Sequence, residues 1–349
     1  MSGILWLGEA VLLGWLLAWR WIDLRAFEPA WARWLLLAGA GAATGLGAAS
    51  CLFFLVDGLM GSFAAAMGLE LALLAWAAYE VFRRRAQLAV SGGSAKTRTP
   101  MLLTIVVLLG AGIATAAIAA AWESNPQGNW DAWAIWNLRA RFLASEPGLA
   151  ARAWSPLLGP ITHPEYPLLV SGLVGRSWAF GRSSSTVVLK AASYIFFLAL
   201  LAMVAGGVAA LRGPAMGPLA ALVASPALVH EVPAWYADVP LACYLAGAVV
   251  FALLEQPAIA GILAGFALWT KDEGALVLFV FAAALLVFRR WSFWKAAVGA
   301  IPVLALFLLF QRGTGAREWV IPAGGKSTRR EATAEHVEPL WHDRPGVRA

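Results

Sequence analysis

Long apolar runs separated by short polar segments dominate this chain. The runs are continuous in Leu, Ala, Val and Phe without apolar–polar alternation, a pattern that excludes a membrane β-barrel and predicts α-helices. Several runs are shorter than the ~20 residues of a straight span, which is tolerated where helices line a protein cavity. We therefore predict an all-α, polytopic membrane protein with about ten spans, at residues 4–19, 34–56, 60–82, 101–122, 187–211, 214–229, 236–254, 258–270, 274–288 and 293–310.

The composition agrees with a membrane protein. Of the 349 residues, 61% are hydrophobic and 13% are charged, whereas soluble domains average about 25% charged residues. The net charge of +6 comes mainly from short loops between the runs, where membrane orientation and lipid headgroups explain it, so we infer no nucleic-acid partner. Cys51 and Cys243 both fall inside predicted spans and indicate neither a disulfide nor a zinc site.

The loop charges predict the orientation of the protein. Residues 83–100 contain five basic residues and no acid, so we expect this loop to be cytoplasmic. Counting spans then places 123–186, 230–238 and 271–273 on the outer face of a cytoplasmic (inner) membrane.

The same pattern divides the chain into three parts. We predict a three-span segment with a basic cytoplasmic loop at 1–100, a seven-span module at 101–310, and a polar, flexible tail at 311–349.

The first outer loop contains the sequence NWDAWAIWNLRARFL at 129–143. On an α-helix, Trp130, Trp133 and Trp136 would form one stripe, which predicts an outward-facing amphipathic helix in the membrane interface. Asp131 projects away from that stripe, with Arg139 near the same face. Asp131 either caps this helix or acts as a general base beside a lipid-borne substrate.

Three further outer clusters contain polar side chains. In HPEYPLL, two prolines hold His163, Glu165 and Tyr166 in an extended turn, which either leads into a re-entrant or interfacial helix at 166–181 or lines a pocket with Asp131. Asp238 in the segment 230–241 either caps the next helix or binds substrate together with Tyr236.

The last cluster, Lys271 to Glu273, interrupts a long apolar region. A charge in mid-membrane costs about 2.5–3.5 kcal/mol, which favours an outer hairpin for these residues. Lys271 is then either part of a solvated tip or neutralises a phosphate, with Glu273 beside it.

Other chemistries have little support. The chain has no Walker motif, no HExxH, and no glycine-rich dinucleotide motif in a suitable context. No ligand spacing demands a metal, so we assign no metal ligand and no cofactor and leave a divalent ion open.

These four elements, in this order, resemble the GT-C class of polytopic glycosyltransferases, which includes the protein O-mannosyltransferases and aminoarabinose transferases. The resemblance covers about residues 101–310. NWDAWAIWNLRARFL is similar to the acidic first outer loop of that class, and HPEYPLL is similar to its HPPL-like element. Tyr236 to Pro240 resembles a Y-x-D-x-P element, and Gly261 to Gly274 resembles a helix end of the pattern G-x-x-x-G-x-x-x-x-T-K-x-x-G.

The resemblance implies inverting transfer of a sugar from a polyprenyl-phosphate donor to a lipid, glycan or protein acceptor at the outer membrane face. It implies Asp131 as the base, with Arg139, Arg141 and Lys271 stabilising the leaving phosphate. Many members of the class have paired acids in the first loop, whereas Asp131 stands alone here. The alternatives are a non-catalytic lipid-handling protein, such as a flippase or scaffold subunit, and an inactive relative of the class.

Overall fold

The structure is a computed structural model that describes residues 2–22, 27–84, 101–145, 147, 153–154, 158 and 162–313. These residues form helices and connections, with no strand among them. The predicted basic cytoplasmic loop falls mostly on residues 85–100, and the predicted flexible tail falls mostly on 314–349; both of these ranges lie outside the described residues.

Every predicted span coincides with a helix. These helices are α1 (Ser2–Trp21), α2 (Ala30–Met60), α3 (Phe63–Arg84), α4 (Met101–Ser124), α7 (Thr186–Arg212), α8 (Met216–Ala234), α9 (Asp238–Leu253), α10 (Pro257–Thr270), α11 (Glu273–Phe288) and α12 (Arg290–Gly313). Three shorter elements lie between α4 and α7: the π-helical η2 (Ala132–Trp136), α5 (Asn137–Ser145) and α6 (Leu169–Gly181).

Six of these helices are long and apolar enough to cross a membrane, namely α1, α2, α3, α4, α7 and α12. Helices α9, α10 and α11 are also apolar but shorter. Many large apolar side chains on the described helices are exposed, such as Leu108 on α4, Val223 on α8 and Phe288 on α11. Such a surface suits lipid better than water, so the described helices indicate a membrane protein.

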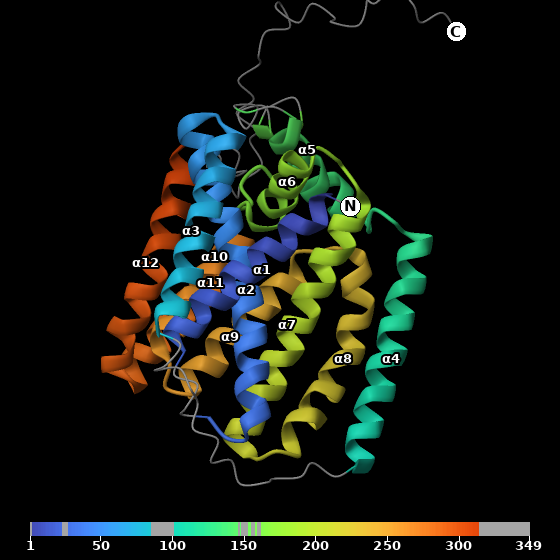
Figure 1. Cartoon of the computed structure of the whole chain (residues 1–349), viewed down its shortest axis with the longest axis vertical. Helices are drawn as coiled ribbons and strands as arrows, with labels where there is room; N and C mark the ends of the chain where they lie inside the picture. Colours follow the sequence, from blue (N-terminus) through green and yellow to red (C-terminus); the bar gives the residue numbers. More distant parts are fainter. Residues whose placement is uncertain are drawn as a thin grey trace, which may run out of the picture.

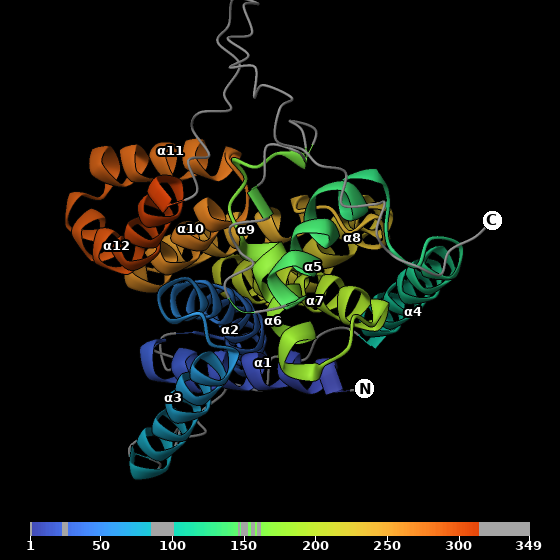
Figure 2. The same cartoon turned by 90° about the horizontal axis from the view of Figure 1, so that it is seen from above.

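The chain passes back and forth along a helical bundle, and η2, α5 and α6 lie together at one end (Figure 1). We call this the α5–α6 end. From above, α2 lies in the middle of the bundle, while α3 and α4 lie at its edges (Figure 2). Helix α2 packs against α1, α6 and α7, so the first three helices share one core with the later ones.

Glycines allow a close contact between α1 and α2 in this core. A Cβ atom at Gly14 of α1 would lie 2.0 Å from the Gly41 carbonyl oxygen of α2, and one at Gly45 would lie 2.0 Å from the Ala10 carbonyl oxygen. Small residues at such crossings let helix backbones approach in the absence of bulky side chains. This contact fixes α1 across the middle of α2.

The apolar segment at 166–181 forms the helix α6, which is buried along most of its length. Its Arg176 is fully buried and donates to the carboxylates of Glu9 in α1 and Glu70 in α3, and also to the Trp6 carbonyl oxygen at 2.8 Å. A buried charge requires such partners. Helix α6 is therefore an internal element at the α5–α6 end, held by two helices that are long and apolar enough to cross a membrane.

The predicted tryptophan stripe is wrong in one member. Trp130 and Trp133 are about half exposed and contact each other with ring centroids 4.3 Å apart, whereas Trp136 is only 1% exposed. The stripe assumed α-helical spacing, but residues 132–136 are π-helical, and a wider turn rotates successive residues by smaller angles. Trp136 consequently points into the protein and only its two predecessors remain outside.

Candidate functional site

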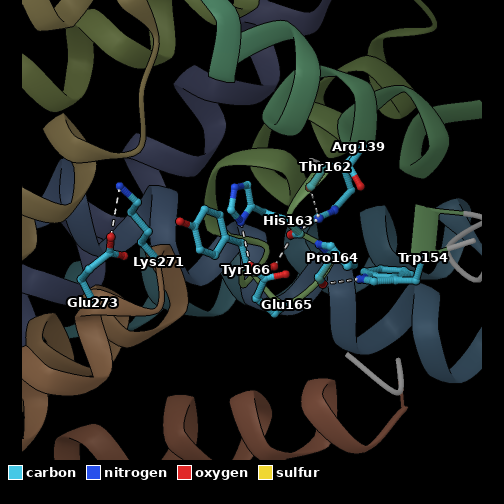
Figure 3. A network of polar contacts seen from close by, with 9 residues as sticks. All are labelled: Arg139, Trp154, Thr162, His163, Pro164, Glu165, Tyr166, Lys271 and Glu273. Carbon is cyan, nitrogen blue, oxygen red and sulfur yellow. Dashed lines mark hydrogen bonds and ion pairs between the residues drawn. The ribbon is translucent and has the colours of Figure 1, made fainter. Parts of the chain in front are cut away.

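Charged side chains from three separate connections meet at the α5–α6 end. Lys271, between α10 and α11, lies 3.3 Å from Asp238 Oδ1 at the start of α9 and 3.4 Å from Glu273 Oε1. Its ammonium group also lies 6.0 Å from the centre of the Tyr166 ring (Figure 3). We call the set His163, Glu165, Tyr166, Asp238, Lys271, Asp272 and Glu273 the Lys271 cluster.

A tight connection positions Lys271. Helix α10 ends at Thr270 and α11 begins at Glu273, and a Cβ atom at Gly274 would lie 1.9 Å from the Ala267 carbonyl oxygen. Glycine is therefore required for α11 to start so close to the end of α10. The short connection directs its charges toward the neighbouring α9 and toward residues 163–166, which we call the HPEY segment.

The HPEY segment faces Lys271 with a stack of aromatic rings. The Tyr166 ring lies parallel to His163, with centroids 4.6 Å apart, and to Trp136, with centroids 5.5 Å apart. His163 adopts a left-handed backbone conformation, with φ of 46°, and its Nδ1 lies 2.7 Å from Glu165 Oε1. The stack fixes Tyr166 and Glu165 at the edge of the cluster.

Arg139 fixes the backbone of the HPEY segment. This buried side chain donates to the carbonyl oxygens of Tyr166 at 2.9 Å, Thr162 at 3.0 Å and His163 at 2.6 Å. Burial lowers its pKa to about 10, although Glu165 and Asp272 act in the opposite direction. Since its donors serve the protein backbone, Arg139 positions the segment and we assign it no phosphate contact.

The sequence did not single out Asp272, which has the most perturbed carboxyl group of the cluster. Burial raises its pKa to about 6, and the charges of Glu165 and Glu273 act in the same direction, against His163 and Arg139. Its buried Oδ1 has no hydrogen-bond partner among the described residues. A carboxyl group with a pKa close to neutral is suited to accept or donate a proton in a reaction.

The environment of Lys271 keeps it charged. Partial burial lowers its pKa, but the charges of Asp238 and Glu273 outweigh this effect, so the pKa is raised overall. The pKa of Tyr166 is also raised, first by burial and then by Glu273. The cluster therefore presents one fixed cation among several carboxylates.

Three predicted site residues lie apart from these contacts. Asp131 precedes η2, and its carboxylate caps no backbone amide and makes no ion pair with a described residue. Arg141 is exposed on α5 and lines a different cavity, beside Arg182. Tyr236 is half-buried two residues before Asp238, on the connection that carries the cluster's α9 contact.

The Asp131 segment nevertheless packs next to that same connection. The Asn129 amide donates to the Ala234 carbonyl oxygen at 3.0 Å, and Trp235 Nε1 donates to Asn137 Oδ1 at 3.0 Å. Helix α9 begins at Asp238, so this residue occupies the first turn of the helix and not the capping position. The four sequence elements are thus neighbours at one end, although Asp131 itself does not contact the cluster.

An apolar cavity of about 360 Å³ lies between α10, α11 and α12. Leu268 and Ala275 line it on either side of the α10–α11 connection, and Phe281 and Phe307 line it further along the helices. Its walls are almost entirely hydrocarbon. A cavity of this composition suits an aliphatic chain.

Among the described residues, no group of three or more His, Cys, Asp or Glu side chains could hold a metal ion. No protein-family model matches the chain, and neither a curated protein nor a solved structure matches it. The site's chemistry must therefore be argued from its own residues.

Proposed function

We propose that this protein is a membrane glycosyltransferase of GT-C type that moves a sugar from a polyprenyl-phosphate donor to an acceptor at the α5–α6 end. The observation that carries the proposal is the Lys271 cluster, where a fixed cation lies among carboxylates next to an apolar cavity. A phosphate-linked lipid needs both features, a cation for its phosphate and hydrocarbon walls for its chain.

The transfer requires a base and a stabilised leaving group. The base removes the proton of an acceptor hydroxyl or amine, the acceptor atom forms a bond to the sugar C1, and the bond from C1 to the phosphate oxygen breaks. The electron pair of that bond leaves with the polyprenyl phosphate, and Lys271 stabilises the charge that develops there. Attack from the face opposite the leaving group inverts the configuration at C1.

Two carboxylates compete for the role of base. The resemblance to the GT-C class assigns it to Asp131, whose carboxylate makes no capping hydrogen bond. The burial of Asp272 and its neighbouring charges favour this residue instead, because they raise its pKa to about 6, which suits proton transfer near neutral pH. Glu165 and Glu273 border the same space and would contact the sugar or the acceptor, with Tyr166 and Tyr236 beside them.

The orientation is part of the proposal. All ten apolar helices cross the cytoplasmic membrane, and the α5–α6 end faces outward. Arg83 at the end of α3 and Arg289 at the end of α11 lie at the end of the bundle opposite to the α5–α6 end. Basic residues favour the cytoplasmic side, so they support this orientation.

Sugar transfer by the purified protein in proteoliposomes tests the proposal. The substrates are a panel of polyprenyl-phosphate sugars with candidate acceptors, and mass spectrometry follows donor consumption. We expect Asp131→Asn or Asp272→Asn to reduce the rate by about 10²–10⁴-fold, the usual contribution of a general base. Glu255→Gln, exposed between α9 and α10 at the opposite end, is the matched control and should retain the wild-type rate.

A second candidate is a lipid-handling protein without catalysis. The isolation of Asp131 from the Lys271 cluster favours it, since a base and its leaving-group cation should act on one substrate. In that case the purified protein binds polyprenyl-phosphate sugars, consumes none of them with any acceptor, and the Asp131→Asn variant binds them as well as the wild type does.

A further inference from the structure

We propose that a second cavity at the α5–α6 end is a phosphate-binding site that is separate from the Lys271 cluster. The cavity has a volume of about 880 Å³ and lies between α5, the end of α6, the start of α3 and the α6–α7 connection. Its polar lining consists of Arg141, Arg182, Ser145, Ser183 and Ser184, and Trp178 forms part of its apolar wall. We call it the two-arginine cavity.

The two arginines are available for a ligand. Both are exposed, and neither forms an ion pair with a carboxylate of any described residue. Other cations at the same end of the bundle are already engaged: Arg139 on backbone carbonyls, Lys190 with Glu123 at 3.7 Å, and Lys271 with Asp238. Within the described part of the chain, no carboxylate compensates the positive charge of the two guanidinium groups that line this cavity.

Helix α5 separates this cavity from the Lys271 cluster. Arg139 and Arg141 are two residues apart on an α-helix and so project about 200° apart around its axis. Arg139 donates to the HPEY segment on one face, and Arg141 lines the two-arginine cavity on the other. The second site can therefore be filled while the first is empty.

The donors match a phosphate group. A guanidinium presents a planar fork of N–H groups that pairs with two phosphate oxygens, and the serine hydroxyls add further donors. The 27-residue helix α7 begins directly after the serines, with Ser185 Oγ accepting from the Val187 amide at 3.3 Å. The partial positive charge of that helix terminus adds to the field of the two arginines.

A hydrogen bond holds the α6–α7 connection, and with it the serine hydroxyls, against the end of α6. Trp178 Nε1 donates to the Ser185 carbonyl oxygen at 3.0 Å, which closes the serine segment onto the end of α6. Arg182 itself has a left-handed backbone, with φ of 48°. Glycine adopts this conformation at lower cost, so the position carries an arginine side chain despite the backbone geometry.

The ligand is a phosphate group carried either by a membrane lipid or by a soluble phosphorylated compound. Phe63 in the lining is the first residue of the membrane-spanning helix α3, so the cavity lies at the level where helices end and lipid headgroups begin. This inference does not rest on glycosyl transfer and holds equally for a lipid-handling protein.

Binding measurements on the full chain test the proposal in two arms. In the first arm, native mass spectrometry counts phosphatidic acid retained by protein from phosphatidylcholine nanodiscs that contain it. In the second, calorimetry measures inorganic phosphate binding to protein in phosphatidylcholine nanodiscs alone. We expect Arg141→Gln and Arg182→Gln each to weaken binding about tenfold, the usual effect of losing a charge-assisted hydrogen bond.

Two further variants keep the test decisive. Arg212→Gln removes an exposed arginine at the other end of α7 and should bind like the wild type. Arg182→Gly retains the left-handed backbone and should fold normally while binding weakly. If the arginine variants lose phosphatidic acid in the first arm, the ligand is a lipid phosphate. If they lose inorganic phosphate in the second arm, the ligand is a soluble phosphate. Binding in neither arm, or equal losses in Arg212→Gln, would overturn the proposal.

Discussion

At the scale of single residues, Lys271 and Asp272 are neighbours in the chain with opposite electrostatic environments. Carboxylates surround the lysine and keep it charged. The aspartate is partly buried, faces two other carboxylates, and has an oxygen without a partner among the described residues. The ionised form of Asp272 therefore destabilises the folded protein, a cost that is typical of residues at functional sites.

This destabilisation predicts that the Asp272→Asn variant is more stable than the wild type, by an amount that depends on pH. The pKa of Asp272 rises from 3.8 to about 6 on folding, so the folded protein binds the proton more tightly than the unfolded chain. Stability falls as the pH rises through that window, and the penalty is complete above it. Solvent screening at this partly open connection reduces the penalty to about 1 kcal/mol.

Thermal unfolding of the two proteins in detergent measures this effect. We expect Asp272→Asn to raise the midpoint by ~2 °C at about pH 7.5 and to leave it unchanged at about pH 4. Asp238→Asn, which removes an exposed partner of Lys271, is the control and should give no such gain. An Asp272→Asn midpoint that is raised equally at both pH values would contradict a shifted pKa.

The sequence identified most of the cluster but missed its most perturbed member. Lys271 and Glu273 stand out because they interrupt an apolar region, Glu165 because it lies between two prolines, and Asp238 because it lies between two spans. The raised pKa of Asp272 depends on Glu165, a residue that is distant in sequence, and on local burial, neither of which is visible in the spacing. The signal that could have identified Asp272 is its place in a run of three charged residues, 271–273, between two apolar helices.

At the scale of elements, α6 links the candidate site to the core of long apolar helices. It follows directly after the HPEY segment, and Arg176 connects it to α1 and α3 through Glu9 and Glu70. The sequence predicted a helix at 166–181. It could not predict the two carboxylate partners, because they lie more than a hundred residues away in the chain.

Removing the arginine alone should therefore be more damaging than removing the whole network. Arg176→Met leaves two buried carboxylates without a cation, which costs about 3–5 kcal/mol. The triple variant Arg176→Met, Glu9→Gln, Glu70→Gln removes the charges together and should regain most of that stability. Thermal unfolding of both proteins measures the difference.

Arg212→Met, at an exposed position at the end of α7, is the matched control and should unfold like the wild type. A triple variant as unstable as Arg176→Met would mean that packing around Arg176, including its ring contacts with Trp6 and Phe180, carries the stability, and the charge network does not.

At the scale of the whole molecule, the connections alternate between the two ends of the bundle. The ends of α8 and α10 meet at the Lys271 cluster, while Arg289 Nη1 lies 2.9 Å from Glu255 Oε1 at the opposite end. The succession of apolar runs predicted this alternation, because counting each run as one pass places successive connections at alternate ends. The packing of α2 in the middle was not predictable, since it depends on glycine contacts between distant helices.

The alternation predicts which positions react from outside the cell. In a background without Cys51 and Cys243, single cysteines at Ser124 and Ser184 mark the α5–α6 end, and cysteines at Glu255 and Arg212 mark the other; all four positions are exposed. With the α5–α6 end outward, a membrane-impermeant thiol reagent labels the first pair on intact cells and labels the second pair only after permeabilisation.

The pattern of labelling separates two errors. If the second pair reacts on intact cells and the first does not, the helices cross as proposed but the orientation is reversed, and the donor would have to approach from the cytoplasm. If Ser124→Cys and Ser184→Cys differ from each other, the helices between them do not place both connections on one side, and the ten-span arrangement fails. Because the Lys271 cluster joins the α8–α9 and α10–α11 connections directly, a mixed result would also remove the basis for a single outward site.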